Sequence, residues 1–167
     1  LIAHPGKFKL YVVDDFNQVF DKARAALTML LQGKDADELD YQNYNRFYER
    51  TRKTLRLLLK VASPEDTGGG GAHLLVTTGS SLKKGKDQIE RSVPALTGQM
   101  SYEILYFFDT VGYLTANAKM VKGDLAFTNK ALFAPIGQVK AKDRFDRLPG
   151  VVDNPTVAHI LDLLIGE

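Results

Sequence analysis

The sequence contains no cysteine. The chain therefore forms no disulfide, holds no thiolate-bound zinc or iron–sulfur cluster, and has no cysteine nucleophile. It also has little excess charge, because 22 lysine and arginine residues are set against 20 aspartate and glutamate residues. A protein dedicated to nucleic acid is usually more basic, so this balance disfavours nucleic acid as the partner. No apolar run approaches the ~20 residues that a membrane-spanning helix needs.

What the sequence does contain is typical of an ordered domain with a hydrophobic core. Hydrophobic residues make up 44% and charged residues 25% of the 167 positions. This length and composition predict one domain over residues 1–167, with enough buried surface to fold without disulfides or metals. The first residue is leucine and not methionine, which favours a processed leader segment.

Two helices are predicted in the first third of the chain. Phe16 and Phe20 begin a series of apolar residues at spacings of three and four, so a helix is expected from the Asp14–Asp15 pair to Gly33. An acidic stretch follows. A second amphipathic pattern then predicts a helix of ~22 residues that ends before Pro64.

The longest apolar series lies in the middle of the chain. Its spacings of three and four over 25 residues are typical of a helix packed in a bundle, and its members are Thr97, Met100, Ile104, Phe107, Val111, Leu114, Ala118 and Val121. Shorter helices are predicted at 87–93, at 125–133 and in the C-terminal segment. Asn154 and Pro155 suit the cap and the first position of that last helix.

These patterns predict an all-α fold, namely an up-and-down four-helix-type bundle with an additional short C-terminal helix. Residues 63–71, which include four consecutive glycines, are expected to form a flexible loop. Residues 136–152 are expected to form an irregular, charged connector before the last helix.

Two aspartates, Asp14 and Asp15, follow the apolar segment Leu10–Val13. The run from Lys9 to Asp15 resembles the first strand and acidic pair of a response-regulator receiver, whose carboxylates would hold Mg²⁺. A receiver also requires alternating strands and helices, whereas residues 38–62 read as one long helix. The favoured interpretation is therefore that the two aspartates cap the helix that follows them.

Other side chains that could do chemistry lack partners at a suitable spacing. The Gly79–Lys86 segment has one residue too many between its glycines for a phosphate-binding loop, and Asp87 stands where Ser or Thr is needed. The three histidines are far apart in the sequence, and the Ser80–Ser81 pair has no neighbouring histidine. We therefore expect no enzyme activity, no cofactor and no metal site.

Basic residues gather at three places, and two of them suggest a docking surface. On the second helix they fall opposite the apolar face, at Arg46, Arg50, Lys53, Arg56 and Lys60. The second group is Lys83, Lys84, Lys86 and Arg91. The third, outside that surface, is Lys140, Lys142, Arg144 and Arg147. Because acidic residues cluster between positions 35 and 40, the charge is separated at little net charge, which favours oriented docking on an acidic protein surface. The alternative is a solvated helix face without a partner.

One segment, Phe108–Lys119, reads Phe-Asp-Thr-Val-Gly-Tyr-Leu-Thr-Ala-Asn-Ala-Lys. It resembles a helix of the PsbQ family, which comprises small four-helix extrinsic proteins on the lumenal side of photosystem II. The glycines at 68–71 and the tail from 136 depart from the plant pattern, so the resemblance is to a divergent algal relative. It implies a subunit without metal or pigment that helps to shield the manganese cluster and to retain calcium and chloride.

The residues and the resemblance together predict a non-catalytic subunit that docks on a large assembly. The resemblance implies that this assembly is photosystem II with its other extrinsic subunits, and that the protein lies in the thylakoid lumen of a chloroplast, peripheral to the membrane. One alternative is a nucleic-acid-associated helical protein that uses the basic side of the second helix. Another is a small-ligand sensor or enzyme in which Tyr102, Tyr106 and Tyr113 line a pocket between helices.

Overall fold

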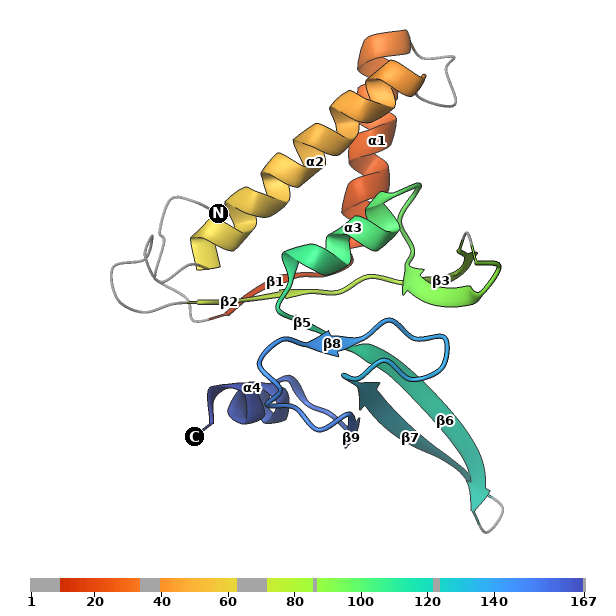
Figure 1. Ribbon diagram of the computed structural model, residues 1–167, viewed down its shortest axis with the longest axis vertical. Helices are drawn as coiled ribbons and strands as arrows, with labels where there is room; N and C mark the ends of the chain where they lie inside the picture. Colours follow the sequence, from red (N-terminus) through yellow and green to blue (C-terminus); the bar gives the residue numbers. More distant parts are fainter. Residues whose placement is uncertain (1–9, 34–39, 63–71, 86, 122–123, 167) are drawn as a thin grey trace. The chain divides into compact units, whose positions relative to one another are not determined.

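Helices and strands are interspersed along the whole chain. The computed structural model describes residues 10–33, 40–62, 72–85, 87–121 and 124–166 (Figure 1), and these residues hold four helices and nine strands. The fold they form is mixed α/β with several small sheets, so the predicted all-α four-helix-type bundle is wrong. The chain divides into two compact units. The first consists of residues 1–80 with 94–101, and the second of residues 81–93 with 102–167.

The first unit contains a pair of parallel strands joined by two helices. Its elements in chain order are β1 (Leu10–Val13), α1 (Phe16–Gln32), α2 (Tyr41–Ala62) and β2 (His73–Val76). The register of the parallel pair runs from Leu10 opposite His73 to Val13 opposite Val76. Parallel neighbours cannot be joined by a tight turn, so the chain crosses over through α1 and α2. Figure 1 shows β1 beside β2, and α1 crossing α2.

The two long helices begin and end where the sequence predicts. α1 ends before Gly33, whose φ of 90° is a conformation that residues with a Cβ avoid. At the start of α2 the Asp40 carboxylate accepts a hydrogen bond from the Asn43 amide at 2.8 Å, and this bond caps the helix. The helical predictions for these two segments are therefore confirmed.

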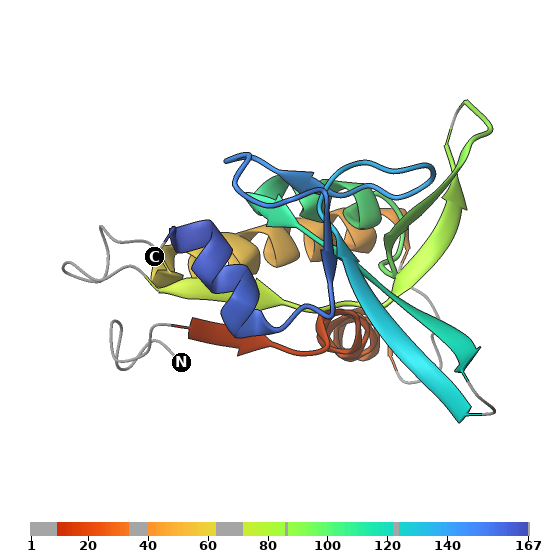
Figure 2. The same ribbon diagram turned by 90° about the horizontal axis from the view of Figure 1, so that it is seen from below.

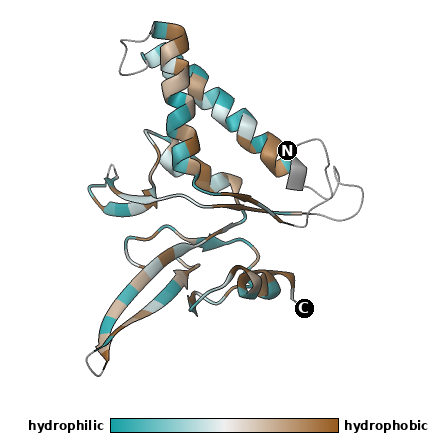
Figure 3. Ribbon diagram, turned by 180° about the vertical axis from the view of Figure 1, so that it is seen from behind, coloured by the Kyte–Doolittle hydropathy of each residue, from teal (hydrophilic) through white to brown (hydrophobic). Residues whose placement is uncertain are grey.

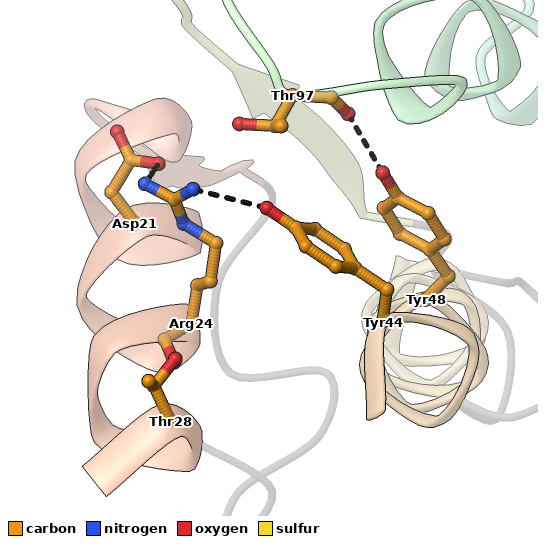
Figure 4. A network of polar contacts seen from close by, with 6 residues as sticks. All are labelled: Asp21, Arg24, Thr28, Tyr44, Tyr48 and Thr97. Atoms are coloured by element: carbon orange, nitrogen blue, oxygen red, sulfur yellow. Dashed lines mark hydrogen bonds and ion pairs between the residues drawn. The ribbon is translucent and has the colours of Figure 1, made fainter. Parts of the chain in front are cut away.

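Aromatic side chains pack α1 against α2. Phe20 and Phe47 meet edge to face with their ring centroids 4.7 Å apart, and both rings are buried. Further along α2, the Leu55 side chain has no exposed surface. Beside the rings, the Arg24 guanidinium donates a hydrogen bond to the Tyr44 hydroxyl at 3.3 Å (Figure 4). Burial of large apolar side chains between the helices therefore stabilises this unit more than its two four-residue strands can.

Residues 94–101 return the chain to the first unit. Within them, the Thr97 carbonyl accepts a hydrogen bond from the Tyr48 hydroxyl at 3.3 Å (Figure 4). The next residue, Gly98, has a φ of +60°, and a Cβ built there would collide with the same Tyr48 hydroxyl. Glycine is required at this position both for its backbone conformation and for the close approach of the ring.

The second unit contains a three-stranded antiparallel sheet in the order β6–β7–β9. Its strands and the helix that follows are β6 (Tyr113–Val121), β7 (Asp124–Leu132), β9 (Val151–Asp153) and α4 (Val157–Ile165). β9 pairs with only three residues of β7, so most of the β6–β7 hairpin extends past it (Figure 2). The core consists of Ala131, Phe133, Leu148 and Val152, against which Ile160, Leu163 and Leu164 of α4 pack.

The remaining elements are short. They are β3 (Ser80–Lys84), which pairs with β4 (Glu90–Pro94), β5 (Thr110–Val111), which pairs with β8 (Lys142–Asp143), and α3 (Met100–Phe107). After β8 the Asp143 carboxylate accepts hydrogen bonds from the amides of Phe145, Arg147 and Leu148 at 3.2, 2.7 and 2.8 Å. Burial alone would raise the pKa of Asp143, but these bonds and one from the Thr110 hydroxyl lower it overall. The ionised carboxylate thus holds this turn together.

The longest predicted helix, over residues 97–121, is wrong beyond Phe107. Residues 113–121 form β6 instead, and Leu114, expected in a buried seam, is 70% exposed. The physical reason is that Gly112 interrupts the helical pattern, and that the residues after it alternate between apolar and polar, which suits a strand. Gly112 also lies so close to the Phe133 ring that a Cβ there would collide with it.

The short helices predicted at 125–133 and 87–93 are wrong as well, because these segments form β7 and β4. Only two residues of sequence, Lys122 and Gly123, separate β6 from β7. Two alternating segments separated by two residues with a glycine are typical of a hairpin. The sequence therefore held the signal for this hairpin, and the spacings of three and four obscured it.

The C-terminal helix is confirmed, but its cap is not the predicted one. α4 begins at Val157, and the Thr156 hydroxyl accepts a hydrogen bond from the His159 amide at 3.1 Å. Asn154 lies before the helix and its side chain binds the Asn129 amide instead, at 3.2 Å. The predicted loop at 63–71 lies outside the described residues. The predicted connector at 136–152 contains β8 and the start of β9, and is otherwise irregular.

Truncation of Leu55 should destabilise the protein strongly. Because Leu55 has no exposed surface, Leu55→Ala leaves a cavity and should lower the free energy of unfolding by about 2–5 kcal/mol. Urea denaturation followed by circular dichroism measures this change. The matched control is Leu57→Ala on the same helix, where the side chain is 53% exposed and the loss should stay below about 1 kcal/mol. Equal losses in both variants would contradict the packing of α2.

Candidate functional site

Polar side chains gather where β1 and β2 both end. Asp14 and Asp15 follow β1 directly, and Thr77 and Thr78 follow β2. Because the two strands are parallel and in register, these four residues lie at the same edge of the pair, which we name the carboxyl edge. Open α/β sheets bind their ligands most often outside the carboxyl ends of parallel strands. The carboxyl edge is therefore the candidate ligand site of the first unit.

Hydrogen bonds fix the side chains at the carboxyl edge. The Thr77 hydroxyl donates a hydrogen bond to the Asp14 carboxylate. In the first turn of α1, the Asn17 side-chain oxygen accepts a hydrogen bond from the Gly79 amide at 3.0 Å and one from the Thr78 hydroxyl at 3.3 Å. These bonds tie the start of α1 to the segment after β2, so the polar groups are held in place before any ligand binds.

The Asp15 carboxylate is the unusual group at this edge. Asp15 occupies the position before α1, yet its side chain makes no capping hydrogen bond. Its Oδ1 atom is shielded from solvent and has no hydrogen-bond partner in the described part of the protein. Since the Asp14 carboxylate binds Thr77, the predicted role of the two aspartates as a helix cap is wrong for their side chains. A shielded carboxylate oxygen without a partner is costly, and a bound cation would remove that cost.

The carboxyl edge offers a metal two carboxylates but no complete cage. Across the described residues, no group of three or more His, Cys, Asp or Glu side chains is placed to hold a metal ion. Mg²⁺ does not require such a cage, because it commonly binds one or two carboxylates and keeps waters or phosphate oxygens as its other ligands. An edge of this composition suits a hard cation that arrives with oxygen ligands of its own.

The sequence contained a sign of the carboxyl edge that the helical interpretation did not use. Each of two short apolar runs is followed by a polar pair, Asp14–Asp15 in one case and Thr77–Thr78 in the other. Short apolar runs that end in polar residues are typical of parallel strands. Asn17 had no such signal, because only the fold brings its side chain beside the segment after β2.

The five basic residues predicted on the second helix form one exposed group, which we name the α2 basic face. It consists of Arg46, Arg50, Lys53, Arg56 and Lys60, all exposed. Successive members are three or four residues apart, so they project from one side of the helix. A shallow hollow on this face is lined by Asn45, Arg46, Glu49, Arg50 and Lys53. The predicted basic stripe of α2 therefore exists as a continuous surface of the first unit.

The second predicted basic group is placed less favourably for docking. Lys83 and Lys84 lie on β3 in the second unit, where partial burial lowers the pKa of Lys83. Arg91 lies on β4, and its guanidinium binds the Asp87 carboxylate through two hydrogen bonds, one of them 2.9 Å long. Lys86 lies outside the described residues. The Arg91 charge is thus largely neutralised by Asp87 within the hairpin that β3 and β4 form.

The tyrosines considered for a pocket between helices lie on different kinds of element. Tyr102 and Tyr106 belong to α3, whereas Tyr113 belongs to β6. Tyr106 is 76% exposed, and the Tyr102 ring has the Lys140 ammonium 5.2 Å from its centroid. The three hydroxyl groups therefore do not line a pocket between packed helices.

Replacing Arg91 should return the Asp87 carboxyl to an ordinary pKa. The hydrogen bond from the Arg91 guanidinium is the largest of several effects that hold the pKa of Asp87 at about 2. Arg91→Gln removes this cationic donor, so the pKa should rise to about 4. Titration of the side-chain carboxyl by NMR measures the change.

The lowered pKa of Asp87 also makes the stability of the folded protein depend on pH. Because the pKa of Asp87 is lower in the folded than in the unfolded chain, the ion pair stabilises the fold above about pH 4 and its contribution is lost as the pH falls towards 2. The control is Arg144→Gln, which removes the partner of Asp109 and should leave the Asp87 titration unchanged. An Asp87 pKa of about 2 in Arg91→Gln would contradict the assignment.

Comparison with protein-family models, with curated proteins and with solved structures finds no match for this chain. The segment that carries the PsbQ resemblance, Phe108–Lys119, lies mainly in β5 and β6 and not in a helix. The segment is therefore not helical in this structure, and the relationship to the PsbQ family stays a prediction. Within the described part of the chain, no helix is long and apolar enough to cross a membrane.

Proposed function

We propose that the first unit binds a divalent cation such as Mg²⁺, together with a phosphate-bearing ligand, at the carboxyl edge of β1 and β2. The observation that carries this proposal is the Asp15 Oδ1 atom, which is shielded from solvent and has no partner among the described residues. Its position at the ends of parallel strands is the usual place for a ligand in an open α/β arrangement.

Each group at the carboxyl edge has a role in this binding. Asp14 and Asp15 supply the negative charge, and the hydrogen bond from Thr77 orients the Asp14 carboxylate. A hard cation held by two carboxylates takes its remaining ligands from water and phosphate oxygens. Carboxylates that follow an apolar strand hold Mg²⁺ against phosphates in this way in nucleotide hydrolases. The positive end of the α1 dipole adds attraction for the phosphate.

Mn²⁺ can replace Mg²⁺ as a paramagnetic probe of this site. On titration it should broaden the NMR amide signals of Asp14, Asp15 and Thr77 first, and inorganic pyrophosphate should increase its affinity because it brings phosphate oxygens. Asp15→Asn removes one charged ligand and should weaken Mn²⁺ binding about 10–100-fold. Asp162→Asn on α4, where the residue is exposed, is the matched control and should bind as the unaltered protein does.

Two results would contradict the cation site. One is broadening that spreads evenly over the exposed carboxylates, and the other is an Asp15→Asn variant that binds Mn²⁺ as tightly as the control. We propose binding alone, without a catalysed reaction, and release of inorganic phosphate from pyrophosphate or a nucleoside triphosphate would overturn that part.

A second candidate function is electrostatic docking of the α2 basic face on an acidic protein surface. Its support is the row of five exposed cations on one side of one helix. Such a row speeds and orients association with an acidic partner. Photosystem II as the partner and the thylakoid lumen as the location rest on the PsbQ resemblance alone, and nucleic acid is the alternative partner for the same face.

Docking through the α2 basic face should depend on salt and on the sign of its charge. Sedimentation with photosystem II membranes stripped of extrinsic subunits should fall as salt rises, because exposed ion pairs are screened within about 10 Å at 0.1 M. Arg50→Glu combined with Lys53→Glu should weaken binding about tenfold or more. Lys22→Glu on α1, also exposed, is the control and should have little effect.

The same variants separate the two partners. Tight binding to duplex or single-stranded DNA, with an affinity that falls steeply with salt, would favour nucleic acid instead. Binding to the membranes that persists in molar salt, or that the charge reversal leaves unchanged, would reject the α2 basic face as the docking surface.

A further inference from the structure

The β6–β7 hairpin has one apolar face, which the second unit covers only at the base of β7. Alternate residues of a strand point to opposite faces. One face therefore carries Leu114, Ala116, Ala118 and Met120 of β6 with their partners Ala131, Asn129, Phe127 and Leu125 of β7. Ala131 at the base is 1% exposed, whereas Phe127 and Met120 towards the tip are 66% and 69% exposed. Figure 3 shows the alternation as hydrophobic and hydrophilic bands along the hairpin.

An open strand edge lies beside this apolar face. β6 is the outermost strand in the order β6–β7–β9, so its outer edge has no partner strand in the part of the chain that the structure describes. Natural edge strands are usually protected by proline, by bulges or by several charges. β6 has no proline and one charged residue, Lys119, over its nine residues. An edge of this kind can accept a further strand through backbone hydrogen bonds.

We infer that β6 pairs antiparallel with β6 of a second copy of this chain, around a two-fold axis at Asn117. Asn117 is the midpoint of the nine residues of β6, so in this register every residue of the strand has a partner. Met120 then faces Leu114 of the second copy, and Ala118 faces its Ala116. The two exposed apolar faces join into one surface across a four-stranded sheet.

The polar face of the hairpin fits the same register. Asn117 meets its own equivalent at the axis, and Lys119 faces Thr115 of the second copy, so no two like charges stand directly opposite each other. The nine pairs extend over about 30 Å. Self-complementarity on both faces is the requirement for a symmetric interface, and β6 meets it in this register. The inference is independent of the cation site, because the hairpin belongs to the second unit.

Two double variants that differ at one position test this register. Ala116 of one copy faces Ala118 of the other, so Ala116→Lys with Ala118→Lys places lysine opposite lysine twice, whereas Ala116→Glu with Ala118→Lys places glutamate opposite lysine twice. Within one hairpin these positions face Asn129 and Phe127, neither of which is charged. Positions 116 and 118 are also neighbours on one face of β6, where two lysines repel each other and a glutamate attracts a lysine. Circular dichroism therefore checks that both variants are folded.

Sedimentation equilibrium over a range of concentrations measures the result. The unaltered chain, of 18.5 kDa, should reach twice that mass, and the lysine–lysine variant should dimerise at least about tenfold more weakly. The glutamate–lysine variant should dimerise about as well as the unaltered chain. A monomer at every concentration would overturn the inference, and so would a lysine–lysine variant that dimerises normally. If both variants lose the dimer equally, an apolar contact without this register is responsible, and the proposed pairing is wrong.

Discussion

The parallel pairing of β1 with β2 is the constraint on which the first unit depends. Parallel neighbours require a long crossover, and α1 and α2 supply it while packing Phe20 against Phe47. The same pairing brings the polar residues that follow both strands to one edge. It also leaves the outer side of α2, with its five cations, exposed to solvent. The two surfaces to which we assign a function in this unit therefore follow from one crossover.

The fold could be predicted from the sequence where local signals agreed with one another. α1 and α2 combine a helical apolar period with clear ends at Gly33 and Asp40, and both were predicted. β6 and β7 lacked that agreement, because their alternation also matches spacings of four. Leu114 and Ala118 fit either pattern, and their pairing with Ala131 and Phe127 across the hairpin decides between them. Pairing between two segments cannot be read from the spacing of residues within one of them.

The two candidate sites also differ in how far the sequence predicts them. The exposed position of the α2 basic face was predicted because all its members lie on one helix, whose geometry follows from spacing alone. Its role in docking stays a prediction. The carboxyl edge was not predicted, although Asp14 and Asp15 were singled out, because their neighbours come from a segment more than sixty residues away in the chain. Arg91 was predicted as a docking residue, and its ion pair with Asp87 could be recognised only from the bend between β3 and β4.

The division of the chain into units also orders events during synthesis. Residues 81–93 belong to the second unit, although the first unit resumes at residues 94–101. On the ribosome, the first unit can close as soon as Gly98 and its neighbours have emerged, while the β3–β4 segment is already made and still lacks the rest of its unit. That segment must wait until residues 102–167 follow. A single cut after residue 101 would therefore free the first unit only together with residues 81–93, and the second unit would lose its β3–β4 segment.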